Sequence, residues 1–215
     1  MGSAWAIVLA GGSGSRYGGP KQFEDLAGRR VVDWSLAAAR ESCDGVVLVV
    51  PAGVDAAEAG PDAVTGGATR SESVRAGLAV VPDDAEVVLV HDAARPLAGP
   101  DLFTRAADAV RAGADGVVPV VPVTDTIKQV EGQLVVATLD RSTLVAVQTP
   151  QAFGARILRD AHAARGDATD DAGLVESIGG KVVVVEGERW NLKLTTPEDL
   201  VVMEALLAHR HGARP

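Results

Sequence analysis

Residues 4–21 read AWAIVLAGGSGSRYGGPK, and this segment indicates both a fold and a kind of ligand. Its first part, residues 4–10, is almost wholly apolar, as in a strand that is buried in a parallel sheet. Five glycines follow within residues 11–19 and let the backbone direct N–H groups at phosphate oxygens. Arg16 and Lys21 add positive charge. We therefore predict a phosphate-binding loop after the first strand of an α/β sheet, with a flexible surface loop as the alternative.

The rest of the chain alternates short β-branched runs with alanine-rich amphipathic stretches. This alternation predicts an α/β fold, a Rossmann-like, mostly parallel sheet flanked by helices. We expect one domain that comprises residues 1–215. The predicted strands are 4–10, 46–50, 87–91, 116–122, 144–148 and 182–186. The predicted helices are 32–41, 71–80, 100–113, 155–165, 170–178 and 197–211.

Residues 124–140 break this alternation. Two β-branched runs lie on either side of Glu131-Gly132-Gln133, which predicts a β-hairpin rather than a helix. A lone hairpin is only marginally stable in water, so this inserted arm, about residues 123–142, is expected to pack against another surface. A second copy of the chain is the natural candidate, and we predict a homodimer that forms through the arm.

The overall charge and the cysteine content restrict the partners and the compartment. The 215 residues carry a formal net charge of −9, which argues against nucleic acids and anionic membranes as partners. The single cysteine, Cys43, excludes an intrachain disulfide and fits a reducing compartment. The apolar run at residues 5–10 is too short for a signal peptide or a membrane span. We expect a cytoplasmic protein.

Two common phosphate-binding motifs do not fit the glycine loop. The dinucleotide fingerprint requires a third glycine where Tyr17 stands, and the P-loop requires Gly-Lys-Ser/Thr, whereas Gly19 is followed by Pro20 and Lys21 by Gln22. The pattern that remains is Gly-Gly-x-Gly-x-Arg, with Pro-Lys five residues after the arginine. This pattern resembles the nucleotide-sugar and cytidylyl transferases, in which the arginine and lysine flank the α-phosphate and the departing pyrophosphate.

Two further segments combine loops with charged or small residues. In residues 66–73, paired glycines precede a helix, where Ser71 or Ser73 is expected either to cap the helix or to meet a nucleotide. In residues 90–96, Asp92 follows an apolar strand, at a position where α/β enzymes place metal ligands. Arg95 is a candidate for binding an acceptor phosphate, and a local Asp–Arg ion pair is the alternative. His91 is given no catalytic role.

The last segment with a clear pattern is Trp190-Asn191-Leu192-Lys193-Leu194-Thr195-Thr196-Pro197-Glu198-Asp199. Its alternation predicts that Asn191, Lys193 and Thr195 share one face. Thr196, Pro197 and the two acidic residues then predict the start of the final helix.

Taken together, these segments resemble the 2-C-methyl-D-erythritol 4-phosphate cytidylyltransferase family. The resemblance implies transfer of CMP from CTP to 2-C-methyl-D-erythritol 4-phosphate with release of pyrophosphate, a step of non-mevalonate isoprenoid biosynthesis. The matching motifs run in order from Leu9 to Asp199 and are Gly-x-Gly-x-Arg with Pro-Lys, Gly-Gly-x-x-Arg-x-x-Ser, His-Asp-Ala-Ala-Arg-Pro, Pro-Val-x-Asp-Thr-x-Lys, Asp-Arg, Gln-Thr-Pro-Gln, Thr-Asp-Asp-Ala and Asn-x-Lys-x-Thr-x-Pro-Glu-Asp.

The resemblance also implies roles for the residues that match. The implied catalytic residues are Arg16, Lys21 and Lys193. The implied nucleotide-binding residues are Ala10, Gly11, Gly12, Gly14, Gly67, Arg70, Ser73 and Ala93. The implied acceptor-binding residues are Asp92, Arg95, Thr126, Arg141, Thr149 and Thr169, with Thr126 and Arg141 acting across a dimer interface. Asp92 is the implied ligand, directly or through water, of Mg²⁺ or another divalent cation.

Other functions remain open at this point. Ribitol 5-phosphate cytidylyltransferases share most of the motifs but tend to read His-Asp-Ser-Val-Arg-Pro, so Ala93 and Ala94 favour the methylerythritol acceptor. A purine nucleotidyltransferase would share the first loop but not the segments at 91–96 and 191–199 together. A non-catalytic nucleotide-binding module could dispense with Lys21, Asp92 or Lys193, all of which are present.

Overall fold

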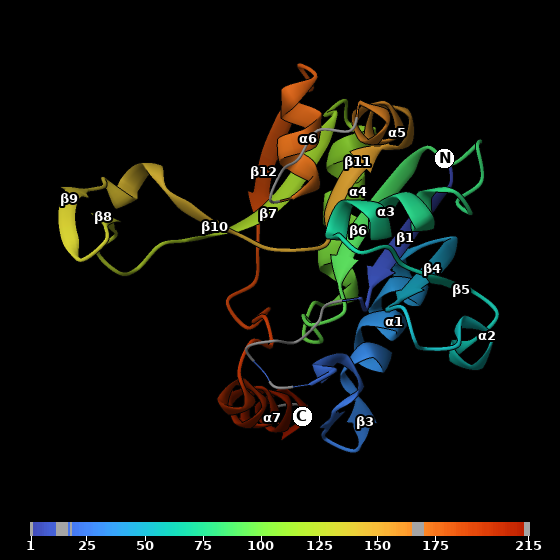
Figure 1. Cartoon of the computed structure of the whole chain (residues 1–215), viewed down its shortest axis with the longest axis horizontal. Helices are drawn as coiled ribbons and strands as arrows, with labels where there is room; N and C mark the ends of the chain where they lie inside the picture. The colour runs from blue at the N-terminus through green and yellow to red at the C-terminus, as the bar shows by residue number, and fades with distance from the viewer. Residues whose placement is uncertain (1, 12–16, 18, 165–169, 213–215) are drawn as a thin grey trace.

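An eight-stranded, mostly parallel sheet forms the centre of the computed structural model, which describes residues 2–11, 17, 19–164 and 170–212 (Figure 1). The strand order is β10-β7-β11-β6-β1-β4-β5, and β12 also pairs with β7. Strand β1 runs parallel to β4 and β6, whereas β11 runs antiparallel to β6 and β7. The strands are β1 Ala4–Leu9, β4 Gly45–Val50, β5 Ala63–Thr65, β6 Val87–Asp92, β7 Gly116–Pro122, β10 Val145–Val147, β11 Gln151–Gly154 and β12 Val182–Glu186. The predicted α/β fold is confirmed.

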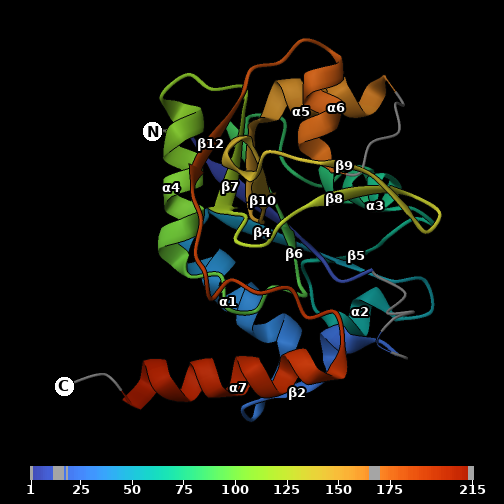
Figure 2. The same ribbon diagram turned by 90° about the vertical axis from the view of Figure 1, so that its left-hand side faces the viewer.

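Helices cover both faces of the sheet (Figure 2). Helices α1, Val31–Ser42, and α4, Pro100–Arg111, cover one face. Helices α3, Arg70–Leu78, α5, Ala155–Ala163, and α6, Asp171–Ser177, cover the other. The alternation of side chains along β1 explains the two cores, because Ala6 and Val8 join the first cluster while Ile7 joins the second.

A third apolar cluster lies beyond the carboxyl edge of the sheet. Helix α7, Pro197–Gly212, packs there against the short strand β2, Asp25–Leu26, which pairs with β3, Arg29–Arg30 (Figure 2). The start of α7 is fixed by Asp199, whose Oδ2 accepts hydrogen bonds from the backbone N–H groups of Thr195, at 2.7 Å, and Thr196, at 2.8 Å. The cluster ties the end of the chain to the segment that follows the glycine loop. Its buried members are Leu26, Val31, Ala94, Leu97, Leu194, Met203 and Leu207.

The predicted hairpin is present as β8, Lys128–Glu131, and β9, Leu134–Thr138. It stands away from the sheet on the left of Figure 1 and reaches β10 through the short 3-10 helix η2, Arg141–Thr143. Gly132 has a φ of 59°, which suits the tight turn between the strands. The arm exposes the apolar side chains of Val130, Leu134, Val135, Val136 and Leu139, and the adjoining strand β10 exposes Val145 and Val147.

Several short elements were not predicted: the 3-10 helix η1 Lys21–Phe23, β2, β3, α2 Ala56–Ala59, β5 and β11. Each has too few residues to show a periodic pattern. Strand β11 is also antiparallel to β6 and β7, within a sheet that was predicted to be mostly parallel. It is the continuation of β10 beyond a bend at residues 148–150, and both strands pair antiparallel with β7.

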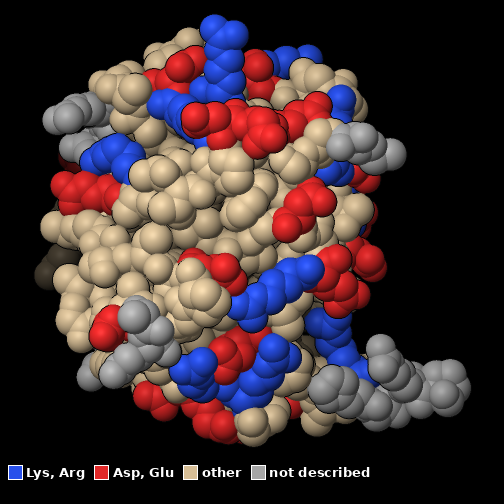
Figure 3. Space-filling view, turned by 90° about the vertical axis from the view of Figure 1, so that its right-hand side faces the viewer, with Lys and Arg blue, Asp and Glu red and all other residues tan. Residues whose placement is uncertain are grey.

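Charges of both signs are interspersed on the face shown in Figure 3. The exposed ion pairs include Arg30–Asp33, at 2.8 Å, and Arg40–Asp62, at 3.7 Å, and such pairs contribute little to stability. Among the residues that the structure describes, no helix has both the length and the apolar character needed to cross a membrane.

Candidate functional site

The carboxyl ends of β1 and β6 place Leu9, which precedes the glycine loop, beside Asp92. The Ala93 N–H donates to Leu9 O at 3.0 Å, and the Ala10 N–H donates to Val49 O at 2.8 Å. Ala10 and Ala93, both predicted to bind the nucleotide, are therefore neighbours at one edge of the sheet, where ligands bind in open α/β folds. Four of the predicted site residues lie outside the described part of the chain: Gly12, Gly14, Arg16 and Thr169.

Three charged side chains from distant parts of the sequence meet at this edge. Nζ of Lys193 lies 2.6 Å from Oδ2 of Asp92, and Nε of Arg70 lies 3.8 Å from Oδ1 of the same carboxylate. Burial alone would raise the pKa of Asp92, but the positive charges of Lys193 and Arg70 outweigh it and hold that pKa below its ordinary value. Asp92 is therefore a carboxylate at neutral pH. The structure thus brings together three of the predicted site residues.

Lys21 joins the same region from the other side. Its Nζ donates to the carbonyl oxygen of Leu194 at 2.5 Å, next to Lys193 in the chain. The Leu194 N–H in turn donates to Ala94 O at 2.7 Å, close to Asp92. The two predicted catalytic lysines are thus held near one another, although the intervening sequence spans most of the chain.

Helix α3 begins with a capping box that positions Arg70 at its first residue. Thr69 Oγ1 accepts from the Glu72 N–H at 3.1 Å, and the Glu72 carboxylate accepts from the Thr69 N–H at 3.0 Å. The prediction that Ser71 or Ser73 caps the helix is wrong, because Ser73 lies inside α3 and its hydroxyl donates to Thr69 O at 3.0 Å.

Two glycines pack closely against this helix start. A Cβ at Gly67 would lie 2.2 Å from Cβ of Glu72, so a side chain there would displace the capping residue. A Cβ at Gly11 would lie 3.6 Å from Oγ of Ser73, which is ordinary contact. The predicted nucleotide-binding residues Gly11, Gly67 and Ser73 therefore line one side of the edge that carries Asp92.

A buried polar network fixes Asp92 and Lys193 relative to each other. The Asp92 N–H donates to Thr149 Oγ1 at 3.0 Å, and the same hydroxyl lies 3.1 Å from Nδ1 of His91. Nδ2 of Asn191 donates to Thr149 O at 3.0 Å. Gln148 binds the same segment, because its Nε2 donates to Glu188 O at 2.8 Å. Thr149, predicted to bind the acceptor, is buried and holds its neighbours in place.

The alternation of residues 191–195 predicted that Asn191 and Lys193 share one face. This prediction is wrong. Asn191 is completely buried, Lys193 is 45% exposed in its side chain, and residues 191–195 form no strand in the structure. The segment is instead pinned by Asn191, by Leu194 and by Arg95, and these contacts leave Lys193 free to face Asp92.

Arg95 does not pair with Asp92, so the alternative of a local ion pair is wrong. Its Nη1 donates to Asn191 O at 2.8 Å and its Nη2 to Val147 O at 3.2 Å. Asp92 pairs with Lys193 and Arg70 instead. Arg95 therefore joins the loop after β6 to the segment that carries Lys193.

His91 is buried beside the site and lies against Phe103, with 5.0 Å between the ring centroids. Burial lowers the pKa of His91 to about 4, so the imidazole is neutral at neutral pH.

Comparison with known proteins places this chain in a family. The sequence profile of 2-C-methyl-D-erythritol 4-phosphate cytidylyltransferase (IspD) matches residues 4–209. The chain belongs to this cytidylyltransferase family. Membership makes the chain an enzyme of the nucleotidyltransferase class and confirms the resemblance found in the sequence.

Individual members of the cytidylyltransferase family resemble the chain over nearly its whole length. The enzyme of that name from Rubrobacter xylanophilus is 46% identical and covers 100% of both chains. The enzyme of the same name from Rhodococcus jostii is 49% identical, and the match covers 94% of this chain and 94% of the relative. The crystal structure of the Thermus thermophilus enzyme superposes with a TM-score of 0.82 at 36% identity, covering 94% of this chain and 98% of the other.

Among the described residues, the candidate site around Asp92 offers a metal ion few protein ligands. No group of three or more His, Cys, Asp or Glu side chains is placed there to hold a metal. Mg²⁺ commonly binds through one or two carboxylates together with substrate phosphates. Asp92 supplies one carboxylate, at the carboxyl edge of the sheet. The donor set therefore fits a divalent cation that a bound triphosphate largely holds.

Thr126 and Arg141 lie in the arm, away from the cytidylyltransferase site of their own chain. Both are exposed, and Nη1 of Arg141 donates to Thr124 O at 2.6 Å at the base of the arm. Within the described residues, no hydrogen bond or ion pair joins either side chain to Asp92 or Lys193. A role in the site would require a second chain.

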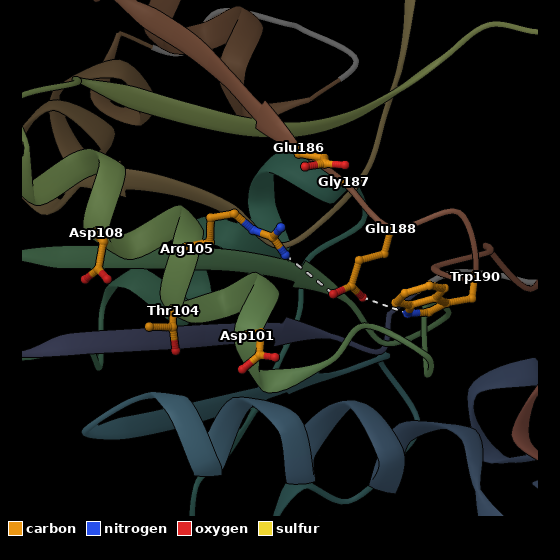
Figure 4. Close-up of a pocket in the computed structure, with 8 residues that line it drawn as sticks. All are labelled: Asp101, Thr104, Arg105, Asp108, Glu186, Gly187, Glu188 and Trp190. Carbon is orange, nitrogen blue, oxygen red and sulfur yellow. Dashed lines mark hydrogen bonds and ion pairs between the residues drawn. The ribbon is translucent and has the colours of Figure 1, made fainter. Parts of the chain in front are cut away.

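A groove of about 700 Å³ lies on the other side of the Lys193 segment, between α4 and the loop after β12 (Figure 4). Glu188 is at its centre, 3.5 Å from Nη2 of Arg105 and 3.0 Å from Nε1 of Trp190. The groove contains none of the predicted site residues. Its contacts instead hold the loop that leads to Asn191 and Lys193 against α4.

Sequence reasoning missed a buried pair next to Arg70. Asp171 and His162 are almost completely buried, and Asp171 Oδ2 accepts from Nη1 of Arg70 at 2.7 Å. The Thr-Asp-Asp-Ala motif pointed to this region. Only the tertiary structure shows which of its two aspartates turns inward.

Proposed function

We propose that this cytidylyltransferase transfers CMP from CTP to 2-C-methyl-D-erythritol 4-phosphate and releases pyrophosphate. The observation that carries the proposal is the 2.6 Å contact between Lys193 and Asp92. It unites the two sequence segments that distinguish this family from purine nucleotidyltransferases, His91–Pro96 and Asn191–Asp199, at the edge where the glycine loop begins. The product would serve non-mevalonate isoprenoid biosynthesis.

The proposed reaction needs no catalytic base. An oxygen of the acceptor's phosphate attacks the α-phosphorus of CTP, and a new P–O bond forms. The bond from the α-phosphorus to the oxygen that bridges to the β-phosphate breaks, and pyrophosphate leaves with that electron pair. A phosphate monoester has a second pKa of about 6, so the attacking oxygen is largely ionised at neutral pH. The main obstacle is the repulsion between two anions, which positive charge and positioning overcome.

Lys21 and Lys193 supply this charge from the described residues, and Arg16 adds to it. Lys193 is the better placed of the two lysines to act at the reacting phosphates, because its side chain is 45% exposed at the edge of the site. Arg70, Gly67, Ser73, Ala93, Ala10 and Gly11 form the proposed nucleotide side, with Gly12 and Gly14. When bound, Mg²⁺ would be held by Asp92 and would neutralise charge on the triphosphate.

The acceptor side is proposed to form from Asp92, Arg95, Thr149 and Thr169, completed by Thr126 and Arg141 of a second copy. Thr149 acts there by positioning, because its hydroxyl already bonds the Asp92 N–H and contacts His91. The exposed apolar side chains of the arm support a homodimer, since large apolar patches on a monomer mark interaction sites. The lone Cys43 suits a cytoplasmic enzyme with soluble substrates.

The experiment that tests this function is pyrophosphate release with Mg²⁺. CTP should be paired with 2-C-methyl-D-erythritol 4-phosphate and, separately, with D-ribitol 5-phosphate, and UTP, ATP and GTP serve as controls. Rapid release only with CTP and the methylerythritol phosphate is expected. Release with ribitol phosphate instead would keep the chemistry and change the acceptor, whereas CTP binding without turnover would indicate a non-catalytic module.

A further inference from the structure

A row of four side chains connects the buried interior to the site. Nε2 of His162, on α5, lies 2.9 Å from Oδ1 of Asp171, the first residue of α6. The other oxygen of Asp171 accepts from Nη1 of Arg70 at 2.7 Å. Nε of Arg70 then lies 3.8 Å from Oδ1 of Asp92. Three helices thus contribute to one chain of contacts.

Asp171 is completely buried, and its side chain meets both requirements of a buried carboxylate. Such a group is tolerated when it is paired with a positive charge and its oxygens accept hydrogen bonds. Arg70 provides the charge and one hydrogen bond. Because a carboxylate oxygen only accepts, Nε2 of His162 is the donor for the other oxygen. Neither partner can be removed without leaving Asp171 incompletely satisfied.

The neighbouring aspartate, Asp170, has a different role, so of the two residues only Asp171 contacts Arg70. Oδ1 of Asp170 accepts from the Gly173 N–H at 3.0 Å and so caps α6, and its Oδ2 accepts from Nε2 of Gln151 at 2.8 Å. Asp170 therefore fixes where α6 begins. That placement turns the next residue, Asp171, toward Arg70.

Two carboxylates compete for the Arg70 guanidinium, and the distances show which one holds it. The contact with Asp171 is a hydrogen bond of 2.7 Å, whereas that with Asp92 is 3.8 Å and is longer than a hydrogen bond. Asp171 therefore holds Arg70 more closely than Asp92 does. The carboxylate of Asp92 then remains with Lys193, and the edge of the Arg70 guanidinium stays at the site.

We infer that Asp171 and His162 are positioning residues for the nucleotide side of the site: they fix Arg70 and thereby set the affinity for CTP. This inference rests on the proposed function, in which Arg70 lies on the nucleotide side. Neither residue touches substrate. Their effect should therefore appear in binding of CTP and not in the affinity for the acceptor.

The test uses four variants of the full chain. Asp171→Asn keeps the shape and removes the charge. His162→Gln retains an N–H donor in place of Nε2, whereas His162→Leu removes it. Leu158→Val is the matched control, because Leu158 is a fully buried residue of α5 that belongs to the apolar core. KM for CTP, KM for the acceptor and kcat are measured by pyrophosphate release, and CTP binding is measured by calorimetry.

Asp171→Asn is expected to raise KM and Kd for CTP by about 10- to 100-fold, since hydrogen bonds to charged groups contribute on that scale. KM for the acceptor should change less than about twofold. His162→Leu should show a smaller increase of the same kind, His162→Gln should restore CTP binding, and Leu158→Val should lower thermal stability alone. The inference would be overturned by normal CTP binding in folded Asp171→Asn. It would also be overturned if His162→Gln and His162→Leu weakened CTP binding equally.

A direct readout of Arg70 separates this inference from the proposed function. NMR of the Arg70 guanidinium should show restricted rotation in the parent protein and faster rotation in Asp171→Asn and His162→Leu. If the parent protein releases no pyrophosphate, the function fails, while this measurement and CTP calorimetry still decide the inference. If Asp171→Asn does not fold, the comparison of His162→Gln with His162→Leu decides it. Unchanged rotation of Arg70 in both His162 variants would rule out the positioning role.

Discussion

Nζ of Lys193 lies 2.6 Å from Oδ2 of Asp92, although 101 residues separate them in the sequence. Asp92 ends a central strand of the sheet, whereas Lys193 lies in a loop that forms no strand or helix. The geometry of the site therefore depends on what holds that loop. Four kinds of contact do so: the side chain of Asn191, the guanidinium of Arg95, the backbone of Leu194 and the ammonium of Lys21.

Lys193→Ala is expected to lower kcat by roughly 100-fold or more, the scale for loss of one preorganised electrostatic donor. The positive charge that offsets the repulsion between the two phosphates would be absent in the transition state. Lys181→Ala is the matched control, because Lys181 is an exposed lysine at the start of β12. Steady-state pyrophosphate release compares the two. Normal turnover in Lys193→Ala would remove Lys193 from the mechanism.

Asn191→Ala should lower both stability and activity. The change removes the donor to Thr149 O and leaves that carbonyl group without its buried partner, at a cost of about 1–3 kcal/mol in the free energy of unfolding. It also loosens the segment that carries Lys193, so kcat should fall even at temperatures where the variant is fully folded. Urea unfolding and turnover of the folded protein give the two values. A stability loss with unchanged kcat would show that Asn191 does not position Lys193.

Charged substitutions on the arm are expected to separate the proposed homodimer. Leu134 is 67% and Val135 54% exposed in the single chain, so Leu134→Asp with Val135→Asp would place two charges in the interface. Sedimentation should show dimers for the parent protein and monomers for this variant, with a loss of turnover at the same time. Val201→Asp is the control, because Val201 is 68% exposed on α7, outside the arm. A monomeric parent protein would contradict the proposed assembly.

His91 should make the fold sensitive to acid. Burial lowers the pKa of His91 from 6.5 to about 4. Below pH 6.5 the unfolded chain binds a proton that the folded chain does not, so the free energy of unfolding falls as the pH drops toward 4. His91 alone should account for about 2 kcal/mol between pH 7 and pH 5.

The variant His91→Asn has no titrating group at this position and should lack that part of the pH dependence. Urea unfolding of both proteins at pH 7 and pH 5, without nucleotide or divalent ions, gives the difference. Equal pH dependence in the two proteins would show that the pKa of His91 is the same in the folded and the unfolded chain.

The central strands and most helices could be predicted because their periodic patterns are long enough to be recognised. Strand β11 could not, since its four residues have no clear pattern and its direction is set by pairing with β6 and β7. Local order in the sequence suggested Ser71 or Ser73 as a helix cap, but the reciprocal bonds of Thr69 and Glu72 fix the helix start one residue earlier.

Within the candidate site, the sequence pointed to the charged residues but not to the buried residues that position them. Asp92 and Lys21 stand out because each lies in a segment that follows a buried strand, whereas Lys193 was singled out by the family motif at residues 191–199. The burial of Asn191 was missed because alternation alone does not show which side of a loop faces the core. Asp171 was missed because its partners, Arg70 and His162, come from two other helices and adjoin it only in the folded chain.

The packing of α7 and the Lys193 segment against the start of the chain has a consequence for synthesis of the protein. The hydrogen bond from Lys21 to Leu194 spans 173 residues, and the cluster around Leu26 includes Met203 and Leu207. The ribosome therefore completes the glycine loop, Asp92 and the strands up to β11 long before it adds the lysine that pairs with that aspartate. A nascent chain can form most of the sheet, but it gains both lysines of the reaction only when its last helix has emerged and docked.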